Sequence, residues 1–415
     1  MNTKRRAFTL IELLVVVTIL VSLIAITLPL AKKLIDDSYT REASRQLNAY
    51  FAMAKIQAVR TGRPWGLYLQ CDLPLGLPTT SPLRQVTKVY LAEVQPPYAG
   101  STIGAKAEIY ITNAMTGERQ FVPVILDSMG NSVRDTNGEV VYLKQLIEEG
   151  EQFVVRFDYK GEWYRCQRGD TTNPNPAAWN NADNFYYIGT LNDLGYPVPP
   201  GFGDNTLSYA ASRTFQILRG PRRVGNPLEL TSGCCIDVAY CGVGPSDSGV
   251  NAPATSSNGT GFQATTAAVQ ALTVMFTAAG GVEGIYVNTT PMEVQGTVHF
   301  LVGRVQKINS PQGTPADAQA QAQYGINMFD PESSNLADPT SLWVSVSRST
   351  GTVTTSDNLP PSLVSGSTAP NLSYQYYLAG TSQTATVNTG NAAQRTNYVG
   401  YCRLLAASRD QKGGL

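Results

Sequence analysis

An uncharged apolar run near the start of the chain is the feature that most constrains its fold. Over residues 8–31 the single ionisable side chain is Glu12, and a basic cluster at residues 4–6 precedes the run. As a helix rising about 1.5 Å per residue, the run is long enough to cross roughly 30 Å of hydrocarbon. A lone carboxylate in such a segment is costly and marks a functional residue by default. The run therefore predicts a membrane-inserted helix in which Glu12 has a specific partner.

An ordinary secretory signal peptide is the alternative for a basic leader followed by an apolar run. This run is longer than the usual apolar core of about 7–15 residues, and its end, LPLAKK at residues 28–33, offers no small-x-small cleavage site. We therefore expect residues 8–31 to stay on the mature chain, with the basic leader on the cytoplasmic side.

The residues around Glu12, AFTLIELLV at positions 7–15, resemble the prepilin cleavage and methylation motif of type IV pilins and type II secretion pseudopilins. The resemblance implies that a prepilin peptidase/methyltransferase cuts between Ala7 and Phe8 and methylates the new amino group of Phe8. It also implies that Glu12 meets the amino terminus of a neighbouring subunit, and such pairing removes the penalty of an isolated buried charge. The family usually has Gly before the cut, so Ala7 is a departure, although a mild one.

The same resemblance implies partners and a location. The partners are other pilin or pseudopilin subunits, an inner-membrane assembly platform and, before assembly, membrane lipid. The location is the inner (cytoplasmic) membrane, crossed once with the C-terminal domain extracytoplasmic, and then a pilus or pseudopilus. A weaker resemblance, carried by AMAKIQAVRTGRP at residues 52–64, is to the FimT/GspH-like minor pseudopilins.

The helix is predicted to continue over residues 32–62 as an amphipathic segment. Its apolar face recurs at three- and four-residue spacing and consists of Tyr39, Ala43, Leu47, Tyr50, Ala54 and Ala58. Pro29 removes one backbone donor, so we expect a kink or local melting there. The Gly62-Arg63-Pro64 sequence predicts the end of the helix.

The remaining residues, 63–415, predict a β-rich globular domain with long loops. Runs rich in β-branched and aromatic residues predict strands at 65–71, 86–94, 107–112, 121–126, 153–166 (a hairpin turning at 159–161), 213–224, 272–287, 296–308 and 342–355 (a hairpin about 349–351). One further helix is expected, near Val140–Glu149. Polar stretches at 242–263, 309–340 and 356–395 predict loop insertions.

The fold class expected is therefore α+β, with a long N-terminal helix packed on a β-rich domain. Its segments are a leader over 1–7, a transmembrane or filament-core helix over 8–31, an amphipathic extracytoplasmic helix over 32–62, and the pilin-like domain over 63–415.

Six cysteines predict possible disulfides in an oxidising compartment. They are Cys71, Cys166, Cys234, Cys235, Cys241 and Cys402. Six cysteines allow 15 pairings, and the sequence does not choose among them. Adjacent Cys234 and Cys235 would seek different partners. We expect no metal site.

Residues that carry enzyme chemistry are sparse. The single histidine, His299, lies in a strand pattern and is interpreted as structural. Residues 135–139, DTNGE, match part of a calcium loop without its full frame, so a plain turn is preferred and calcium is the one cofactor left open. The expected function is a non-enzymatic structural subunit of a type II secretion pseudopilus or type IV pilus.

Two alternatives stay open. One is a minor pilin that binds a ligand such as DNA through Arg219, Arg222 and Arg223, although a solvated loop explains this triplet as well. The other is a signal-anchored extracytoplasmic enzyme, which lacks any sequence support such as a Gly-x-Ser-x-Gly motif.

Overall fold

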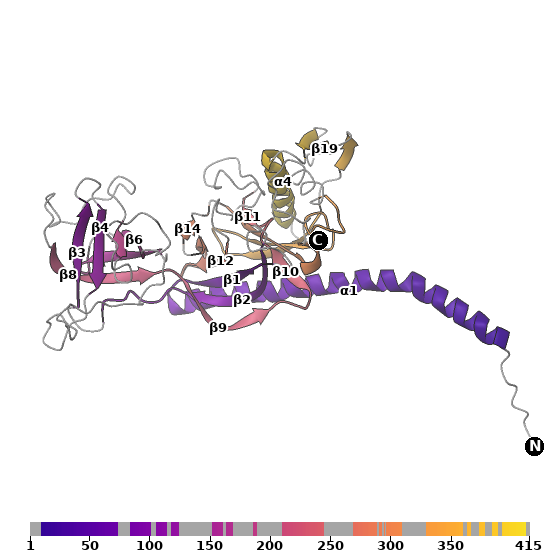
Figure 1. Ribbon diagram of the computed structural model, residues 1–415, viewed down its shortest axis with the longest axis horizontal. Helices are drawn as coiled ribbons and strands as arrows, with labels where there is room; N and C mark the ends of the chain where they lie inside the picture. The colour runs from indigo at the N-terminus through magenta and orange to yellow at the C-terminus, as the bar shows by residue number, and fades with distance from the viewer. Residues whose placement is uncertain are drawn as a thin grey trace, which may run out of the picture.

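The computed structural model describes most of the chain in separate ranges. The described residues are 10–73, 84–100, 105–113, 118–123, 152–160, 163–168, 186–188, 210–244, 269–288, 290–292, 294, 296–308, 329–359, 363–366, 373–377, 384–388 and 392–411. Within these ranges the fold is α+β, as expected: a long helix and a short C-terminal helix enclose a large antiparallel sheet (Figure 1).

Helix α1 spans Leu10–Thr61, 52 residues in one helix. Its second half lies along the sheet, whereas its N-terminal half projects beyond the body (Figure 1). The predicted end is confirmed, because Gly62 has a φ of 65° and its N–H donates to the Ala58 carbonyl at 3.0 Å. A residue in the left-handed region after the last turn is a common helix stop, and glycine adopts it without steric cost.

The docked half of α1 buries one stripe of small and large apolar side chains. Ala43, Leu47, Phe51, Ala54 and Ala58 are fully buried against the sheet. Phe51 replaces the predicted Tyr50 at the centre of this face, and Tyr50 packs at its margin. The amphipathic prediction is thus confirmed for Ala43, Leu47, Ala54 and Ala58, whereas Tyr39, which was predicted on the same face, is 41% exposed.

Aromatic rings connect α1 to the sheet. The Phe51 ring lies 5.6 Å from that of Phe300 and 6.2 Å from that of Phe276, the second pair edge to face. Such pairs add about 0.5–1.5 kcal/mol beyond the area they bury. They anchor the helix over the middle of the sheet.

The main sheet has 11 strands among the described residues, all paired antiparallel. Its path is β14 (Thr290–Met292), β13 (Val282–Val287), β12 (Ala271–Phe276), β1 (Trp65–Asp72), β2 (Gln85–Glu93), β10 (Cys234–Asp237), β15 (Val298–Arg304), β16 (Leu342–Val346) and β17 (Val353–Asp357). Strand β9 (Arg222–Glu229) adds to β2, and β11 (Gly242–Val243) adds to β15. The short 3-10 helix η1 (Val305–Lys307) follows β15.

The two faces of the sheet bury different cores. On β15, Phe300 and its alternate neighbours face α1, whereas Leu301 belongs to a second cluster on the opposite face. That second cluster includes Trp343 of β16 and Tyr398 and Cys402 of helix α4 (Ala392–Gln411). The sheet is therefore sandwiched between α1 and α4 over its β10–β17 half.

Helix α4 and the strands before it correct the expectation of one further helix and a loop over 356–395. Strands β18 (Leu363–Gly366), β19 (Ser373–Tyr377) and β20 (Thr384–Asn388) form a separate antiparallel sheet within that range. The helix expected near 140–149 lies outside the described residues. So do most of the other two predicted loops, except 242–244 and 329–340.

A second β unit is inserted between β2 and β9. Strands β3 (Lys106–Asn113), β4 (Glu118–Pro123), β7 (Tyr186–Ile188), β6 (Tyr164–Arg168), β5 (Gln152–Phe157) and β8 (Ala210–Arg219) close into a barrel. The barrel lies at the end of the molecule opposite the free part of α1 (Figure 1).

The chain enters and leaves the barrel side by side. Tyr98, on the way in, and Ile217, on the way out, exchange both backbone hydrogen bonds at 2.7 and 2.8 Å. Since β2 and β9 are also paired, the two connections form one antiparallel neck between barrel and sheet.

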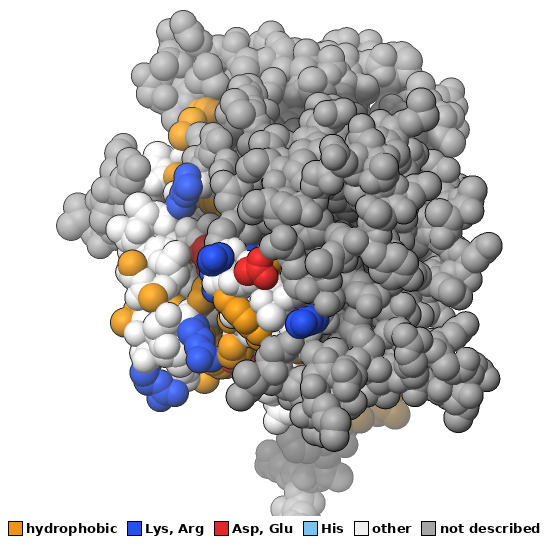
Figure 2. Space-filling model, turned by 90° about the vertical axis from the view of Figure 1, so that its left-hand side faces the viewer, with side chains coloured by type: hydrophobic (Ala, Val, Ile, Leu, Met, Phe, Trp, Pro, Cys, Tyr) orange, Lys and Arg blue, Asp and Glu red, His pale blue; other side chains and the backbone are white. Residues whose placement is uncertain are grey.

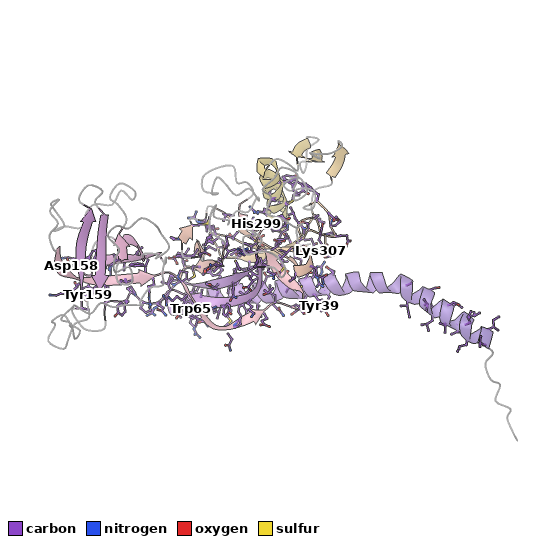
Figure 3. The ribbon with its side chains drawn as sticks, in the orientation of Figure 1. Tyr39, Trp65, Asp158, Tyr159, His299 and Lys307 are labelled. Carbon is purple, nitrogen blue, oxygen red and sulfur yellow. The ribbon has the colours of Figure 1, made fainter. Side chains whose placement is uncertain are left out.

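The β5–β6 hairpin turns through two residues in the left-handed region. Asp158 has a φ of 54° and Tyr159 a φ of 57°, and the Lys160 N–H donates to the Phe157 carbonyl at 3.2 Å. The hairpin is confirmed, with its turn beginning one residue earlier than predicted. Both values suit a type I′ turn, which favours Asn-Gly, so an exposed tyrosine at the second position is strained. Figure 3 places this turn at the far end of the barrel.

Candidate functional site: the N-terminal half of helix α1

The free part of α1 exposes apolar side chains all around the helix. Their exposed fractions range from 47% to 82%, and the residues are Leu10, Ile11, Leu13, Leu14, Val15, Val16, Val17, Ile19, Leu20, Val21, Leu23 and Ile24. A helix that is apolar on every side is stable only when other apolar material surrounds it. This segment therefore requires lipid or protein around it.

The few hydroxyl groups in this segment are satisfied within the helix. Thr18 Oγ1 donates to the carbonyls of Leu14 and Val15 at 3.0 and 2.8 Å, and Ser22 Oγ donates to the Thr18 carbonyl at 2.8 Å. Because these bonds satisfy the two hydroxyl groups, the surface that Leu13–Ile24 offers to a neighbour is apolar.

Glu12 lies in the first described turn of α1, whereas the cleavage residues Ala7 and Phe8 lie outside the described residues. Only the backbone of Glu12 is described, so its pairing stays a prediction.

Pro29 does not interrupt α1, which is helical from Leu10 to Thr61. The local melting considered for this position is absent, and Figure 1 shows the helix bending gently over its free part instead. Among the described residues, none of the helices is long and apolar enough to cross a membrane.

Polar contacts fix the point at which α1 leaves the body. Arg41 pairs with Asp37 on the helix at 3.2 Å and with Asp357 of β17 at 3.8 Å, and the Arg304 guanidinium lies 5.7 Å from the Tyr39 ring. Each exposed ion pair adds little to stability. The contacts with Asp357 and Arg304 link α1 to the sheet at this point, whereas the pair with Asp37 lies within the helix.

Five of the six cysteines are buried free thiols in the structure: Cys71, Cys234, Cys235, Cys241 and Cys402. Burial raises the pKa of Cys241 and of Cys402 to about 12, and raises those of Cys71 and Cys235 as well. The side chain of Cys166 lies outside the described residues. The structure assigns no pairing, so the disulfides stay a prediction, and thiols of such high pKa react slowly.

His299 lies fully buried between the sheet and α4. Its Nδ1 is 2.8 Å from Ser345 Oγ, and its ring meets that of Trp343 edge to face at 6.3 Å. Burial, assisted by the nearby Arg403 guanidinium, lowers the pKa of His299 to about 3. The imidazole is therefore neutral at physiological pH, in keeping with its interpretation as a structural residue.

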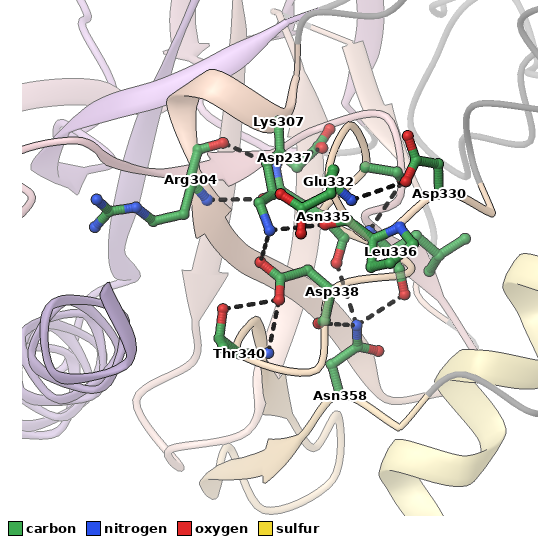
Figure 4. A network of polar contacts seen from close by, with 12 residues as sticks. Asp237, Arg304, Lys307, Asp330, Glu332, Asn335, Leu336, Asp338, Thr340 and Asn358 are labelled. Atoms are coloured by element: carbon green, nitrogen blue, oxygen red, sulfur yellow. Dashed lines mark hydrogen bonds and ion pairs between the residues drawn. The ribbon is translucent and has the colours of Figure 1, made fainter. Parts of the chain in front are cut away.

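A buried polar cluster of residues from β10, β15 and the segment 329–358 was missed by the sequence reasoning (Figure 4). Asn335 is its centre: its Oδ1 accepts from the Arg304 N–H at 2.7 Å, and its Nδ2 donates to Asp237 Oδ2 and to the Arg304 carbonyl, both at 3.1 Å. Gly303 is required beside it, because a Cβ there would come within 2.2 Å of Asn335 Oδ1.

Two further residues of this cluster hold the segment 329–341 in place. Asn358 Nδ2 donates to three carbonyls of that segment, at 2.8 to 3.2 Å. Lys307 Nζ contacts Asp338 Oδ2 at 2.6 Å and donates to the Pro331 carbonyl at 2.7 Å. Buried side-chain networks of this kind make a loop rigid. The described part of the predicted 309–340 loop, residues 329–340, is thus held in place by side chains.

The cluster does not form a metal site. In the ranges that the structure describes, no group of three or more His, Cys, Asp or Glu residues could hold a metal ion. The calcium alternative at residues 135–139 lies outside those ranges.

The arginine triplet of the DNA alternative lies along the neck. Arg219 contacts Gln95, Arg222 stands opposite Glu93 across the β2–β9 pair, and the Arg223 guanidinium lies 5.4 Å from the Tyr90 ring. Figure 2 looks at the barrel end of the molecule, where the Lys and Arg side chains among the described residues lie singly between hydrophobic and other side chains. Nothing here favours a phosphate-binding surface over structural roles.

Comparison with known protein families identifies the N-terminal region. Residues 2–28 match the family model described as the prokaryotic N-terminal methylation motif, which is the signature of type IV pilins and pseudopilins. The match ends within the free half of α1. No curated protein and no solved structure matches the chain.

Proposed function

We propose that the chain is a structural subunit of a type II secretion pseudopilus or a type IV pilus, and that it assembles through the free half of α1. The observation that carries the proposal is a coincidence of position. The methylation motif at residues 2–28 falls on the part of α1 that exposes apolar side chains on all sides, while residues 43–58 are packed on the body.

In this proposal, a prepilin peptidase/methyltransferase cuts between Ala7 and Phe8 and methylates the amino group of Phe8. Membrane lipid surrounds residues 8–31 before assembly, and an inner-membrane platform then transfers the helix into the filament. Glu12 pairs with the amino terminus of the next subunit, so a charge that costs free energy in isolation sets the register between subunits. The role as a FimT/GspH-like minor subunit is the finer form of this proposal.

The test is the behaviour of Glu12 variants in a filament-forming host. We expect Glu12→Leu to be inserted in the membrane and processed, yet to be recovered in sheared filaments at least tenfold less than the wild type. Glu42→Leu is the matched control, since Glu42 is an exposed carboxylate on the same helix with weak partners, Arg45 at 3.8 Å and Gln46 Nε2 at 3.5 Å. Equal incorporation of Glu12→Leu and the wild type would remove the proposed register contact.

Processing is tested separately by mass spectrometry of the mature protein. We expect loss of residues 1–7 and the addition of one methyl group. A mature chain that retains Met1 would contradict the processing step while leaving the Glu12 test intact.

A further inference from the structure

The β5–β6 hairpin carries two features that assembly through α1 leaves unused. Its turn holds a tyrosine, Tyr159, that is 42% exposed and has a φ of 57°. Next to the turn, β5 presents Arg156 on its outward face, since the flanking residues Val155 and Phe157 are buried. Figure 3 shows the turn at the end of the molecule farthest from the free part of α1. Both features therefore belong to the outer tip of the barrel.

Tyr159 occupies a position where it costs stability. Asp158 and Tyr159 both have a positive φ, which costs a non-glycine residue about 1 kcal/mol or more. The turn is nevertheless fixed, because the Asp158 N–H donates to the Thr214 carbonyl at 2.9 Å and Thr214 Oγ1 donates to Asp158 Oδ1 at 3.5 Å. Glycine at position 159 would relieve the strain, so hairpin formation gives no reason for a large aromatic side chain there. Strain that neighbouring residues hold in place is typical of binding residues.

Arg156 is held in one orientation by two half-buried side chains. Its Nε donates to Gln216 Oε1 at 2.5 Å, and its Cζ lies 4.6 Å from the centre of the Trp163 ring. Residues 156 and 216 stand opposite each other in the β5–β8 pair, so the backbone fixes this contact. The described residues offer no hydrogen bond or ion pair to the two Nη groups of Arg156. The guanidinium is thus fixed in place while its fork of Nη donors keeps its binding capacity.

We propose that this tip binds a polysaccharide whose sugars carry carboxylate groups. We call Arg156, Asp158, Tyr159, Trp163 and Gln216 the tip patch. The Nη fork of a fixed arginine matches the two oxygens of a carboxylate. The face of an aromatic ring is negative and attracts the C–H groups of a sugar ring. Tyr159 follows Arg156 by three residues, so their α-carbons are at most about 11 Å apart. An acidic sugar and its neighbour in the polysaccharide therefore reach both side chains.

Asp158 decides between this ligand and other anions. Each strand of a nucleic acid carries a phosphate about every 3.4 Å, so the phosphate beside the one on Arg156 would meet the Asp158 carboxylate. A neutral sugar at that place instead donates its hydroxyl groups to the carboxylate. An acidic peptide presents carboxylates without a ring of C–H groups for Tyr159. The tip patch therefore favours a polysaccharide in which acidic and neutral sugars alternate.

Binding of the purified full-length chain in detergent to immobilised hyaluronan, measured by biolayer interferometry, tests the proposal. Hyaluronan alternates a sugar that carries a carboxylate with a neutral one. We expect saturable binding that is at least tenfold tighter than binding to dextran, which has sugar rings without carboxylates. A peptide of alternating Glu and Ser, which has carboxylates without sugar rings, and oligothymidylate, which has phosphates, should also bind at least tenfold more weakly.

Two variants test whether the tip patch is the binding site. Arg156→Lys keeps the charge but loses the planar fork, and Tyr159→Gly removes the ring while it relieves the strain. Each should raise the dissociation constant for hyaluronan at least tenfold. Tyr159→Gly should at the same time unfold at a higher temperature than the wild type, so unfolding would not explain its loss of binding. Circular dichroism of both variants at the assay temperature checks that they are folded.

The matched controls are an arginine and a tyrosine outside the tip patch. Arg223 also lies over an aromatic ring, that of Tyr90 at 5.4 Å, and Tyr39 is 41% exposed, nearly as much as Tyr159. Arg223→Lys and Tyr39→Ala should bind hyaluronan as the wild type does.

Four results would overturn the inference. They are absence of saturable binding to hyaluronan, equal affinity for hyaluronan and dextran, equal affinity for hyaluronan and either the peptide or oligothymidylate, and wild-type affinity of Arg156→Lys or Tyr159→Gly. These measurements use the isolated chain and need no filament, so failure of the proposed function would leave them unaffected.

Discussion

Asp237 and His299 should give the protein two opposing pH dependences. Asp237 is buried and bonded to Asn335 and to the Ala239 N–H, and burial raises the pKa of its carboxyl from 3.8 to about 7. Burial lowers the pKa of His299 from 6.5 to about 3. At a pH between its two pKa values, Asp237 is protonated in the folded protein and ionised in the unfolded chain. At a pH between its two pKa values, His299 is neutral in the folded protein and protonated in the unfolded chain.

The signs follow from proton linkage. Between about pH 4 and 7 the folded state binds the extra proton on Asp237, so this group raises the free energy of unfolding as the pH falls. Between about pH 3 and 6.5 the unfolded state binds the extra proton on His299, so that group lowers the free energy of unfolding as the pH falls. Each slope is about 1.4 kcal/mol per pH unit in the middle of its window. From pH 6 to 4.5 the two contributions cancel.

Asp237→Asn should reveal the contribution of His299 to the pH dependence of the free energy of unfolding. The variant loses one acceptor oxygen, which costs about 1–2 kcal/mol at every pH. Beyond that constant loss, its free energy of unfolding relative to the wild type should fall by about 2 kcal/mol between pH 6 and 4.5. For His299→Phe, the free energy of unfolding relative to the wild type should rise by a similar amount between pH 6 and 4.5.

Urea unfolding followed by far-ultraviolet circular dichroism measures this difference. This signal follows the whole sheet, which includes the strands of His299 and Asp237. Subtracting the free energy of unfolding of the wild type at each pH removes the contributions of the titratable groups that both proteins share. A difference between Asp237→Asn and wild type that is constant from pH 6 to 4.5 would refute the titration reasoning.

Three substitutions test packing and backbone geometry by denaturant unfolding. Phe51→Ala should lower the free energy of unfolding by about 3–5 kcal/mol, because it leaves a cavity between α1 and the two phenylalanine rings it contacts. Tyr159→Gly should raise it by roughly 1 kcal/mol by relieving the left-handed strain, whereas Lys160→Gly should not, since φ at 160 is not positive. Gly303→Ala should lower it by about 2 kcal/mol or more, because the new Cβ displaces Asn335 and leaves buried polar groups without partners.

Two further substitutions serve as controls for Phe51→Ala and Gly303→Ala. Met53→Ala alters an exposed side chain on the same helix as Phe51 and should shift stability by no more than about 0.5 kcal/mol. Gly220→Ala adds a Cβ where nothing lies within 4 Å, so it should be similarly mild. If either control matched its test variant, the packing or clash argument for that position would be wrong.

Local patterns predicted much of α1 and the sheet. The three- and four-residue spacing of Ala43, Leu47 and Ala54 identified the docked face, and Gly62 marked the helix end, because both signals depend on neighbouring residues alone. The β-branched runs at 65–71 and 86–94 became β1 and β2 for the same reason. The methylation motif likewise stands in one continuous segment, so the candidate site was found from sequence.

Long-range features escaped the sequence reasoning. Asn335 and Asp237 are 98 residues apart, and neither belongs to a motif, so only the fold brings their side chains together. Helix α4 was missed because its buried residues, such as Tyr398 and Cys402, are few and separated by polar ones. The insertion of the barrel between β2 and β9 was missed because strand runs do not reveal which strands pair across more than a hundred residues.

The neck formed by Tyr98 and Ile217 has a mechanical consequence. Tension applied to α1 passes through the buried stripe into the main sheet, since Phe51 joins the helix to β12 and β15. Two chain connections join the barrel to that sheet, and both leave the sheet at one point. The force therefore does not pass through the barrel, and the two chain ends of the barrel are not pulled apart. The strained Tyr159 turn at its far end would thus keep its shape while α1 is under tension.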